Sequence, residues 1–230
     1  MPISLVQSAS KQVTGASSTT ISLPSNVTAG NCVVVFSASW FNNSSTVTDG
    51  LSNSYTSLVT GDNGGVSPFV RILAAYNASG GALTATVNFT GSADASIIIA
   101  EFSGVAAATA SESANTATGT SASPTVSTSA TTTDAGDVIV GIVTHAGATN
   151  TITEAGLLIA EQENNSTSQA GNAQYTLPGT IGTQSLNWTI STSEFWLAAI
   201  VALKPAAGQP MSMRWQNIPH AGARIQRMGV

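Results

Sequence analysis

Charged side chains are the scarcest feature of this chain of 230 residues. Only 7% of its residues are Asp, Glu, Lys or Arg, against about 25% in an ordinary soluble domain. Disordered chains are poor in Val, Ile and aromatic residues, whereas here 42% of the residues are hydrophobic and recur in regular runs. The composition therefore predicts an all-β protein whose outer face consists of Thr, Ser and Asn.

The few charges are unevenly distributed. Residues 1–208 contain three basic residues and all eleven acidic ones, a net charge of −8. Residues 209–230 contain Arg214, Arg224 and Arg227 and no acid, a net charge of +3. A body without a basic patch does not fit a nucleic-acid-binding protein, so we expect no nucleic-acid partner.

The sequence features of secreted and membrane proteins are also scarce. A single cysteine, Cys32, excludes an intrachain disulfide, and its place in the apolar run Cys32–Phe36 predicts a buried thiol. The first residues have neither the basic nor the apolar region of a standard signal peptide, and no apolar stretch reaches the roughly 18 residues of a membrane span. We therefore expect synthesis and folding in the cytosol, and no membrane partner.

Catalytic motifs are missing as well. The two histidines, His145 and His220, do not have a metal-ligand spacing, and no Gly-x-Ser-x-Gly elbow of a serine hydrolase occurs. We expect His145 to be a surface residue at a strand end. Glu101 and Glu194 flank apolar strands, and we expect surface or edge charges there rather than the carboxylate pair of a glycosidase. The sequence thus predicts no enzyme, no catalytic residue, no metal and no cofactor.

Two turn sequences leave calcium open as an alternative. Residues 49–53 and 62–64 each supply several side-chain oxygens within a short stretch, as a calcium loop does. Neither has the spacing of an EF-hand, and both have the composition of ordinary turns. We expect turns rather than calcium sites.

What the chain does have is strand-like alternation. Apolar and polar residues alternate along 83–90, and a buried run follows at 95–102 after a short polar stretch. The same pattern returns at 182–189 and 194–201. A period of two residues is typical of β-strands. We expect each pair of runs to form a hairpin around which its part of the chain is organised.

Further segments recur along the chain. Ala29–Asn31 corresponds to Ala135–Asp137, which lies 106 residues later, and Asn88–Thr90 corresponds to Asn187–Thr189, which lies 99 residues later. The match predicts an internal duplication. The Ala/Ser/Thr-rich stretch 106–123 has the composition of a linker, but its match to residues 2–19 favours a first strand of the second copy.

The spacing of the strands predicts the fold class. Strand runs every 8–12 residues, with turns between them and no helical period, indicate two tandem antiparallel β-sandwich domains. We expect the first repeat at 1–106, the second at 107–206 and a C-terminal arm at 207–230. A jelly roll and an immunoglobulin-like sandwich both fit, and the sequence does not choose between them.

The last 22 residues differ from both repeats. They lack alternation and combine residue types that carry binding energy at interfaces. We expect them to attach the chain to other copies of itself or to a larger scaffold. An arm packed on its own body, and weak nucleic-acid binding by three arginines, are the alternatives. The candidate partner-binding residues are Met211, Met213, Arg214, Trp215, Ile218, Arg224, Ile225 and Arg227.

One aromatic pair is a candidate for sugar binding. Trp40 and Phe41 precede the Asn/Ser stretch 42–45, and aromatic rings beside polar loops can stack on sugars. Packing at the end of a sandwich core is the alternative.

The pattern of the first repeat resembles a known kind of module. Residues 28–35, 46–56 and 82–104 carry Thr-Ala-Gly-Asn before a Val-rich strand, Thr-Val-Thr-Asp-Gly-x-Ser-Asn-x-Tyr-Thr, and Ala-x-Thr-Val-Asn-Phe-Thr before a strand ending Ala-Glu-Phe-Ser-Gly. These resemble tandem β-sandwich modules of phage virion accessory proteins of the decoration type and of secreted bacterial surface proteins. The resemblance covers most of residues 1–205 but not the arm, and it implies a binding or structural module without catalytic residues.

Three functions follow from these observations. We favour a structural protein of a bacteriophage virion, such as a capsid decoration or cement protein or another head or tail accessory protein. It would be made in the host cytoplasm, and its partners would be other copies of itself or a major virion protein. The alternative is a carbohydrate-binding or adhesive module of a bacterial surface protein, located outside the cell and bound to surface glycans. An enzyme is the third.

Overall fold

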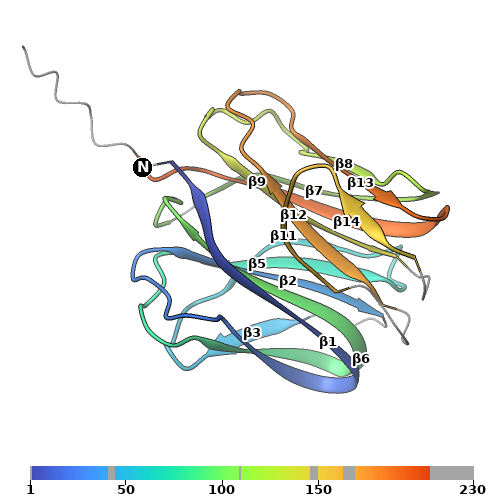
Figure 1. The fold of residues 1–230 in the computed structure, drawn as a ribbon, viewed down its shortest axis with the longest axis horizontal. Coiled ribbons are helices and arrows are strands. Elements are labelled where there is room, and N and C mark those ends of the chain that lie inside the picture. The colour runs from blue at the N-terminus through green and yellow to red at the C-terminus, as the bar shows by residue number, and fades with distance from the viewer. Residues whose placement is uncertain (1, 41–44, 109, 146–149, 163–168, 208–230) are drawn as a thin grey trace, which may run out of the picture.

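The computed structural model describes residues 2–40, 45–108, 110–145, 150–162 and 169–207 (Figure 1). The strands of the first half are β1 (Ser4–Ser22), β2 (Cys32–Trp40), β3 (Thr46–Asp49), β4 (Thr56–Gly61), β5 (Phe69–Ala75) and β6 (Thr84–Ser103). Those of the second half are β7 (Ser111–Ser121), β8 (Thr125–Ser127), β9 (Val138–His145), β10 (Ile152–Glu154), β11 (Leu157–Gln162), β12 (Gly171–Thr176), β13 (Ser185–Ile190) and β14 (Glu194–Leu203). The predicted all-β class is confirmed, and β7 supplies the strand expected in the stretch 106–123. No transmembrane helix is found among the described residues.

Strands β1 and β6 are far longer than an average strand, and each contributes to two layers of the sandwich. Residues 4–13 of β1 pair with 95–103 of β6, and residues 16–22 pair with 84–93. Between them the ladder shifts register at Gly15, which has a φ of 61° and donates its N–H to Asp94 Oδ1 at 2.8 Å. Bulges of this kind let a strand turn the corner between two packed sheets. The hairpin predicted at 83–102 is therefore wrong, because its two runs are consecutive parts of one strand.

In the second half the same corner is interrupted. Residues 191–193 separate β13 from β14, and residues 122–124 separate β7 from β8. β13 pairs with β8 and β10, whereas β14 pairs with β7 and β9. The second predicted hairpin is therefore wrong as well. Short polar residues favour a turn, but here they occupy a corner between layers.

Both halves have the same strand order. The first is β1-β6-β2-β5-β4 with β3 beside the early part of β6, and the second is β7-β14-β9-β12-β11 with β10-β13-β8 as its outer sheet. In an immunoglobulin sandwich the first strand lies beside the second, whereas here the first strand pairs with the last. This order excludes the immunoglobulin arrangement and leaves the jelly-roll type. An internal duplication predicts such a shared order, and the duplication itself stays a prediction.

The pairing also gives the register between the halves. Val34 lies opposite Ala74 and Val140 lies opposite Tyr175. Counterparts are thus 106 residues apart at the first central strand and 101 apart in the later strands. At β14 the spacing is thus two residues longer than the 99 expected for the apolar run 95–102. A slip of two leaves every side chain on the same face of its strand, so alternation could not reveal it.

The layer β1-β6-β2-β5-β4 and the five-stranded sheet β7-β14-β9-β12-β11 pack face to face and share a core. In β2, Val33 and Val35 face a core within the first half, whereas Val34 and Phe36 face a core that also contains Val140. Burial on both faces explains the continuous apolar runs in the central strands. Figure 1 shows the resulting layers, with the first half below and the second half above.

Cys32 belongs to this shared core. It is 1% exposed, and burial raises the pKa of its thiol to about 12. The predicted buried thiol is confirmed.

The stacked sheets meet along two edges, which we name the β1–β11 seam and the β4–β7 seam. At the β1–β11 seam, Ser8 Oγ donates to the Ile159 carbonyl at 2.6 Å and Ser10 Oγ donates to the Glu161 carbonyl at 2.9 Å. At the β4–β7 seam, Gly61 lies so close to Thr116 that an added Cβ would be 2.7 Å from its Cγ2. Because β1 corresponds to β7 and β11 corresponds to β4, the two seams are equivalent in the repeat.

Candidate functional site

The predicted partner-binding residues lie outside the described part of the chain. They are Met211, Met213, Arg214, Trp215, Ile218, Arg224, Ile225 and Arg227, and Phe41 and His220 also lie outside it. The structure does place the start of the arm. The N–H of Ala106 donates to the Lys204 carbonyl at 3.0 Å, and the N–H of Ala206 donates to the Gly104 carbonyl at 2.7 Å. The chain therefore enters the arm beside residue 104.

Trp40 is the one member of the candidate sugar-binding pair that the structure describes. It is the last residue of β2, lies opposite Asp94 and is half-buried. Its position at the strand end fits both the sugar-binding and the packing role.

His145 is not the surface residue that the sequence predicts. It is fully buried, and its Nδ1 lies 2.6 Å from Glu194 Oε1. The prediction is wrong because β14 continues alongside β9, which places Trp196 opposite His145. Glu194 Oε1 also accepts a hydrogen bond from Asn150 Nδ2 at 2.6 Å. The three side chains form a partly buried polar contact between strand ends.

Glu101 is likewise buried rather than exposed at an edge. Its side chain is 0% exposed. Its carboxylate accepts hydrogen bonds from Gln7 Nε2 at 2.6 Å, from the Thr28 N–H at 2.9 Å and from Asn31 Nδ2 at 2.6 Å. The prediction failed because the donors come from two distant parts of the chain, β1 and the 28–31 turn. This carboxylate ties the 28–31 turn to β1 and β6.

The two calcium candidates form turns. The Asp49 carboxylate accepts hydrogen bonds from the N–H groups of Leu51 and Asn53, from Asn53 Nδ2 and from Tyr55 OH. These bonds outweigh the opposing effect of burial and lower the pKa of Asp49. Asp62 Oδ1 accepts the N–H of Gly65 at 2.8 Å. Four protein donors already occupy the Asp49 oxygens, which disfavours a cation in this conformation. Within the described ranges, no three His, Cys, Asp or Glu side chains are grouped as metal ligands.

A pair of acids that the sequence did not single out lies at the end of the second half. Asp137 is 1% exposed and lies beside Glu112. Burial, followed by the neighbouring carboxyl and the negative charge of Glu112, raises the pKa of Asp137 to about 7.

Glu112 is the charged partner. Burial opposes its ionisation, but donors outweigh that effect and lower the pKa of Glu112. Its Oε1 accepts hydrogen bonds from the N–H and the hydroxyl of Thr133 and lies 3.3 Å from Lys204 Nζ. Lys204 directly precedes the residues that lead into the arm.

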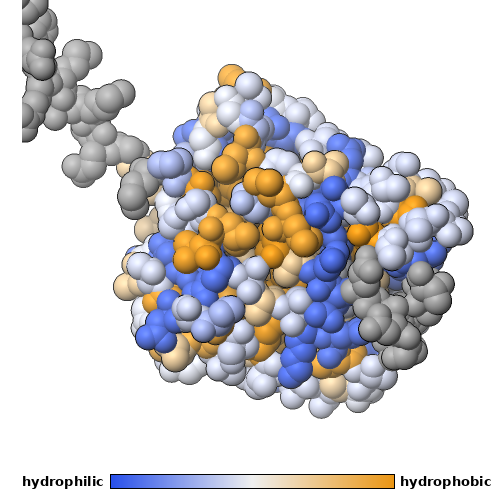
Figure 2. All heavy atoms as spheres, in the orientation of Figure 1, coloured by the Kyte–Doolittle hydropathy of each residue, from blue (hydrophilic) through white to orange (hydrophobic). Residues whose placement is uncertain are grey.

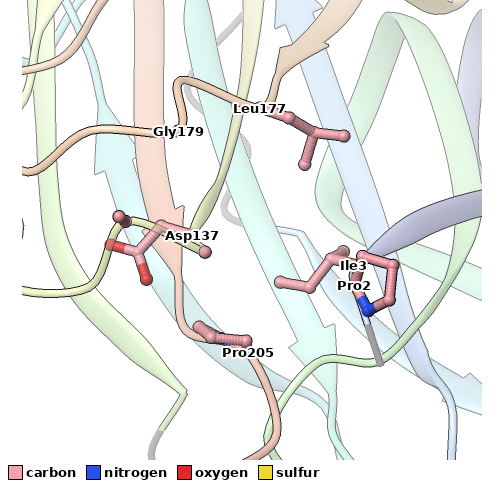
Figure 3. Close-up of a pocket in the computed structure, with 8 residues that line it drawn as sticks. Pro2, Ile3, Asp137, Leu177, Gly179 and Pro205 are labelled. Atoms are coloured by element: carbon pink, nitrogen blue, oxygen red, sulfur yellow. The ribbon is translucent and has the colours of Figure 1, made fainter.

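An apolar groove lies in front of this pair. It has a volume of about 290 Å³, and Pro2, Ile3, Leu177 and Pro205 line it together with residues 135–137 and Gly179. Figure 3 shows Ile3 pointing toward the space between Leu177 and Pro205, while the Asp137 carboxyl is turned away from Ile3. The floor of the groove thus carries backbone and aliphatic surface, with the acid pair behind it.

Exposed aliphatic side chains extend the groove along the β1–β11 seam. Val6, Leu157, Leu158 and Leu177 are each between 41% and 54% exposed. The bonds from Ser8 and Ser10 place β1 alongside β11, the strand that carries Leu157 and Leu158. Figure 2 shows hydrophobic residues gathered over this part of the molecule. Contiguous apolar surface is a common mark of an interaction site.

The equivalent β4–β7 seam is polar. The register between the halves makes Thr56 and Ser57 the counterparts of Leu157 and Leu158. The bulge after Leu5 contains Val6, and the matching bulge in β7 contains Glu112. The fold therefore does not require aliphatic residues at these positions.

Comparison with family models, with curated proteins and with solved structures found no match to this chain. The candidate site consequently stands on its own geometry. Sequence reasoning missed it because its parts are far apart in the chain. The one available signal was the pair Leu157-Leu158 next to a turn, in a protein whose strand ends are otherwise rich in Ser and Thr.

Proposed function

We propose that this chain is a non-enzymatic structural protein of a bacteriophage virion, a capsid decoration protein or another head or tail accessory protein. It attaches through its arm, residues 207–230, to other copies of itself or to a major virion protein. The observation that carries the proposal is the apolar groove and seam located where the chain enters that arm.

The chemistry of the buried groups supports a structural role. The carboxylates of Glu101, Asp49 and Glu112 are held by donors within the protein, and the only thiol is buried with its pKa raised. A rigid body with a shared core and a low-charge Ser/Thr surface suits a protein that lies on a larger particle. The resemblance of residues 28–104 to modules of phage virion proteins and of secreted bacterial surface proteins fits a binding or structural role.

Deletion of residues 209–230 tests this proposal. We expect the shortened chain to keep its β-sheet circular dichroism and to lose association with particles, measured by co-sedimentation of tagged chains from infected cells. The point variant Val66→Ser, which changes an exposed aliphatic residue outside the groove and the seam, is the control and should sediment normally. Normal incorporation of the shortened chain would show that the arm is not the attachment.

A carbohydrate-binding or adhesive module of a bacterial cell surface is the second candidate. The half-buried Trp40 at the end of β2 favours it. A glycan array with the wild-type chain and with Trp40→Ala tests this function. Tight binding that the substitution abolishes would favour it over the virion proposal, and an array without binding would count against it.

A further inference from the structure

The end of the described chain and the groove are built from the same residues. Pro205 lines the groove, and Ala206 is hydrogen-bonded to Gly104. A Cβ at Gly104 would lie 2.8 Å from the carbonyl oxygen of Pro2, which is a further lining residue. The arm therefore begins at the rim of the groove, in every copy of the protein.

The composition of the arm matches this surface. Residues 208–230 contain several large apolar residues, among them Met211, Met213, Trp215 and Ile218. Methionine adapts to irregular apolar surfaces and Trp is a frequent anchor of interfaces. A groove of about 290 Å³ lined by Pro, Ile and Leu offers such side chains a place to be buried.

The charges match as well. The arm carries three arginines and no acid. The 134–137 turn at the border of the groove carries Asp134, which is exposed. An exposed acidic side chain next to an apolar floor suits a basic segment with apolar anchors.

The polar character of the β4–β7 seam indicates which seam serves as a binding surface. If the aliphatic residues served the fold, the repeat would carry them on both seams. Only the seam that leads to the groove carries them, at Val6, Leu157 and Leu158. The fold does not require these aliphatic residues on the β1–β11 seam, so binding explains them best.

We propose that the groove and the β1–β11 seam form the docking site for residues 208–230 of a second copy of this chain. This inference rests on the proposed function, because an arm that docks on its own body cannot link copies. Each copy then presents one arm and one groove, which is a head-to-tail contact. Such a contact closes into a ring or continues as an array on a particle surface.

Cysteine cross-linking of the full chain tests the inference. One variant carries Leu177→Cys at the rim of the groove, and a second carries Trp215→Cys in the arm. The native thiol of Cys32 is buried and does not compete. The two variants are mixed and oxidised, and the products are separated by non-reducing electrophoresis. We expect a disulfide-linked dimer of one chain of each kind. Val66→Cys, an exposed position outside the groove and seam, mixed with Trp215→Cys is the matched control and should give at least tenfold less product.

Association of the full chain supplies a second measurement. We expect Leu177→Asp to weaken self-association by tenfold or more, as measured by sedimentation velocity over a range of concentrations. Leu177 is half exposed, so the variant should unfold at the wild-type denaturant concentration.

Three results would overturn the inference. The first is a wild-type chain that stays monomeric at all concentrations. The second is equal cross-linking to Leu177→Cys and Val66→Cys. The third is a chain carrying both Leu177→Cys and Trp215→Cys that closes a disulfide within itself at high dilution, while separate chains do not link. If deletion of the arm still abolishes incorporation into particles, the proposed function survives and only the docking site is wrong.

Discussion

Each half of the chain buries carboxyl groups beside the turn that precedes its first central strand, and the two halves do so with different chemistry. In the first half, Glu101 on β6 receives three hydrogen bonds, one of them from Asn31 in the turn. In the second half, Asp137 takes the place of Asn31 and Ala202 takes the place of Glu101. In the second half the buried acid thus lies in the turn rather than on the strand, and its neighbour is a second acid, Glu112.

The difference shows which positions the fold depends on. Strand order, apolar phase and the turn are common to both halves. The first network is a carboxylate with a full set of donors, whereas the second is an acid pair that requires a proton or a nearby cation. A sandwich of this type thus tolerates either arrangement at the same place. The two networks should therefore respond differently to mutation and to pH.

The largest expected effect is at Glu101. Replacement by Ala removes the acceptor of three part-buried hydrogen bonds, which come from Gln7 Nε2, the Thr28 N–H and Asn31 Nδ2. Since each lost partner costs about 1–3 kcal/mol, we expect Glu101→Ala to lower the free energy of unfolding by about 3 kcal/mol or more, measured by urea denaturation. Glu101→Gln keeps one acceptor oxygen and should cost less. A loss below about 1 kcal/mol for Glu101→Ala would contradict the view that this network holds the first turn.

A packing difference between the halves gives the next effect. Gly141 occupies the position of Val35, and a Cβ there would lie 2.5 Å from Leu186 Cδ1 and 2.6 Å from the Ala199 carbonyl oxygen. Overpacking of a core typically costs about 1–3 kcal/mol. We expect Gly141→Ala to destabilise the protein by that amount in the same assay. Gly50, with open space around its Cβ position, is the control, and Gly50→Ala should be close to neutral.

The acid pair predicts a pH dependence. The pKa of Asp137 is about 7 in the folded chain and about 3.9 when unfolded, so the folded state holds the extra proton between these values. The free energy of unfolding should therefore fall as pH rises from about 4 to about 7, with a slope of up to about 1.4 kcal/mol per pH unit. Asp137→Asn should remove this contribution to the slope.

Denaturation midpoints measured between pH 5 and pH 8 test this pH dependence, with the difference between wild type and Asp137→Asn as the readout. Glu112 titrates below this window because its pKa is lowered. Asp134 and Lys204 also face the pair, and Asp134→Asn is the control for a general charge effect. If the stability of wild type and of Asp137→Asn changed with pH in the same way, the pKa of Asp137 would not be raised in the folded chain.

The smallest effect on stability is expected at the seams. Leu157→Thr gives the second half the residue of the first, and Thr56→Leu does the reverse. Both positions are exposed, so the free energy of unfolding should change by less than about 0.5 kcal/mol. Leu157→Thr should weaken self-association and Thr56→Leu should not restore it in the double variant, as measured by sedimentation. If the exchange leaves association unchanged, the aliphatic seam is not an interface.

Local pattern was enough to predict the strands and the two halves. Alternation at 83–90 and the apolar run at 95–102 both correspond to strand, and Ala29–Asn31 marks a turn that returns as Ala135–Asp137. What the pattern could not give was connectivity across the corner. The polar residues 90–94 have the composition of a turn, but their bend is fixed by Gly15 and Asp94, which are 79 residues apart.

The candidate site was beyond the reach of the sequence for a related reason. Its surface combines residues near 3, 137, 177 and 205, which only the stacking of the two halves brings together. Burial of Glu101 and His145 was equally invisible, because their partners Asn31 and Glu194 are distant in sequence. The arm was visible from its composition alone, and its residues remain a prediction.

The reactivity of Cys32 can report whether the two halves separate. The lone thiol lies between the two halves, so an alkylating reagent can reach it only when the facing sheets come apart or the whole chain unfolds. The rate at which this sulfur is modified in native buffer, compared with the rate of global unfolding, would report whether the halves ever separate before they melt. The molecule thus carries its own probe of whether it behaves as one body or two.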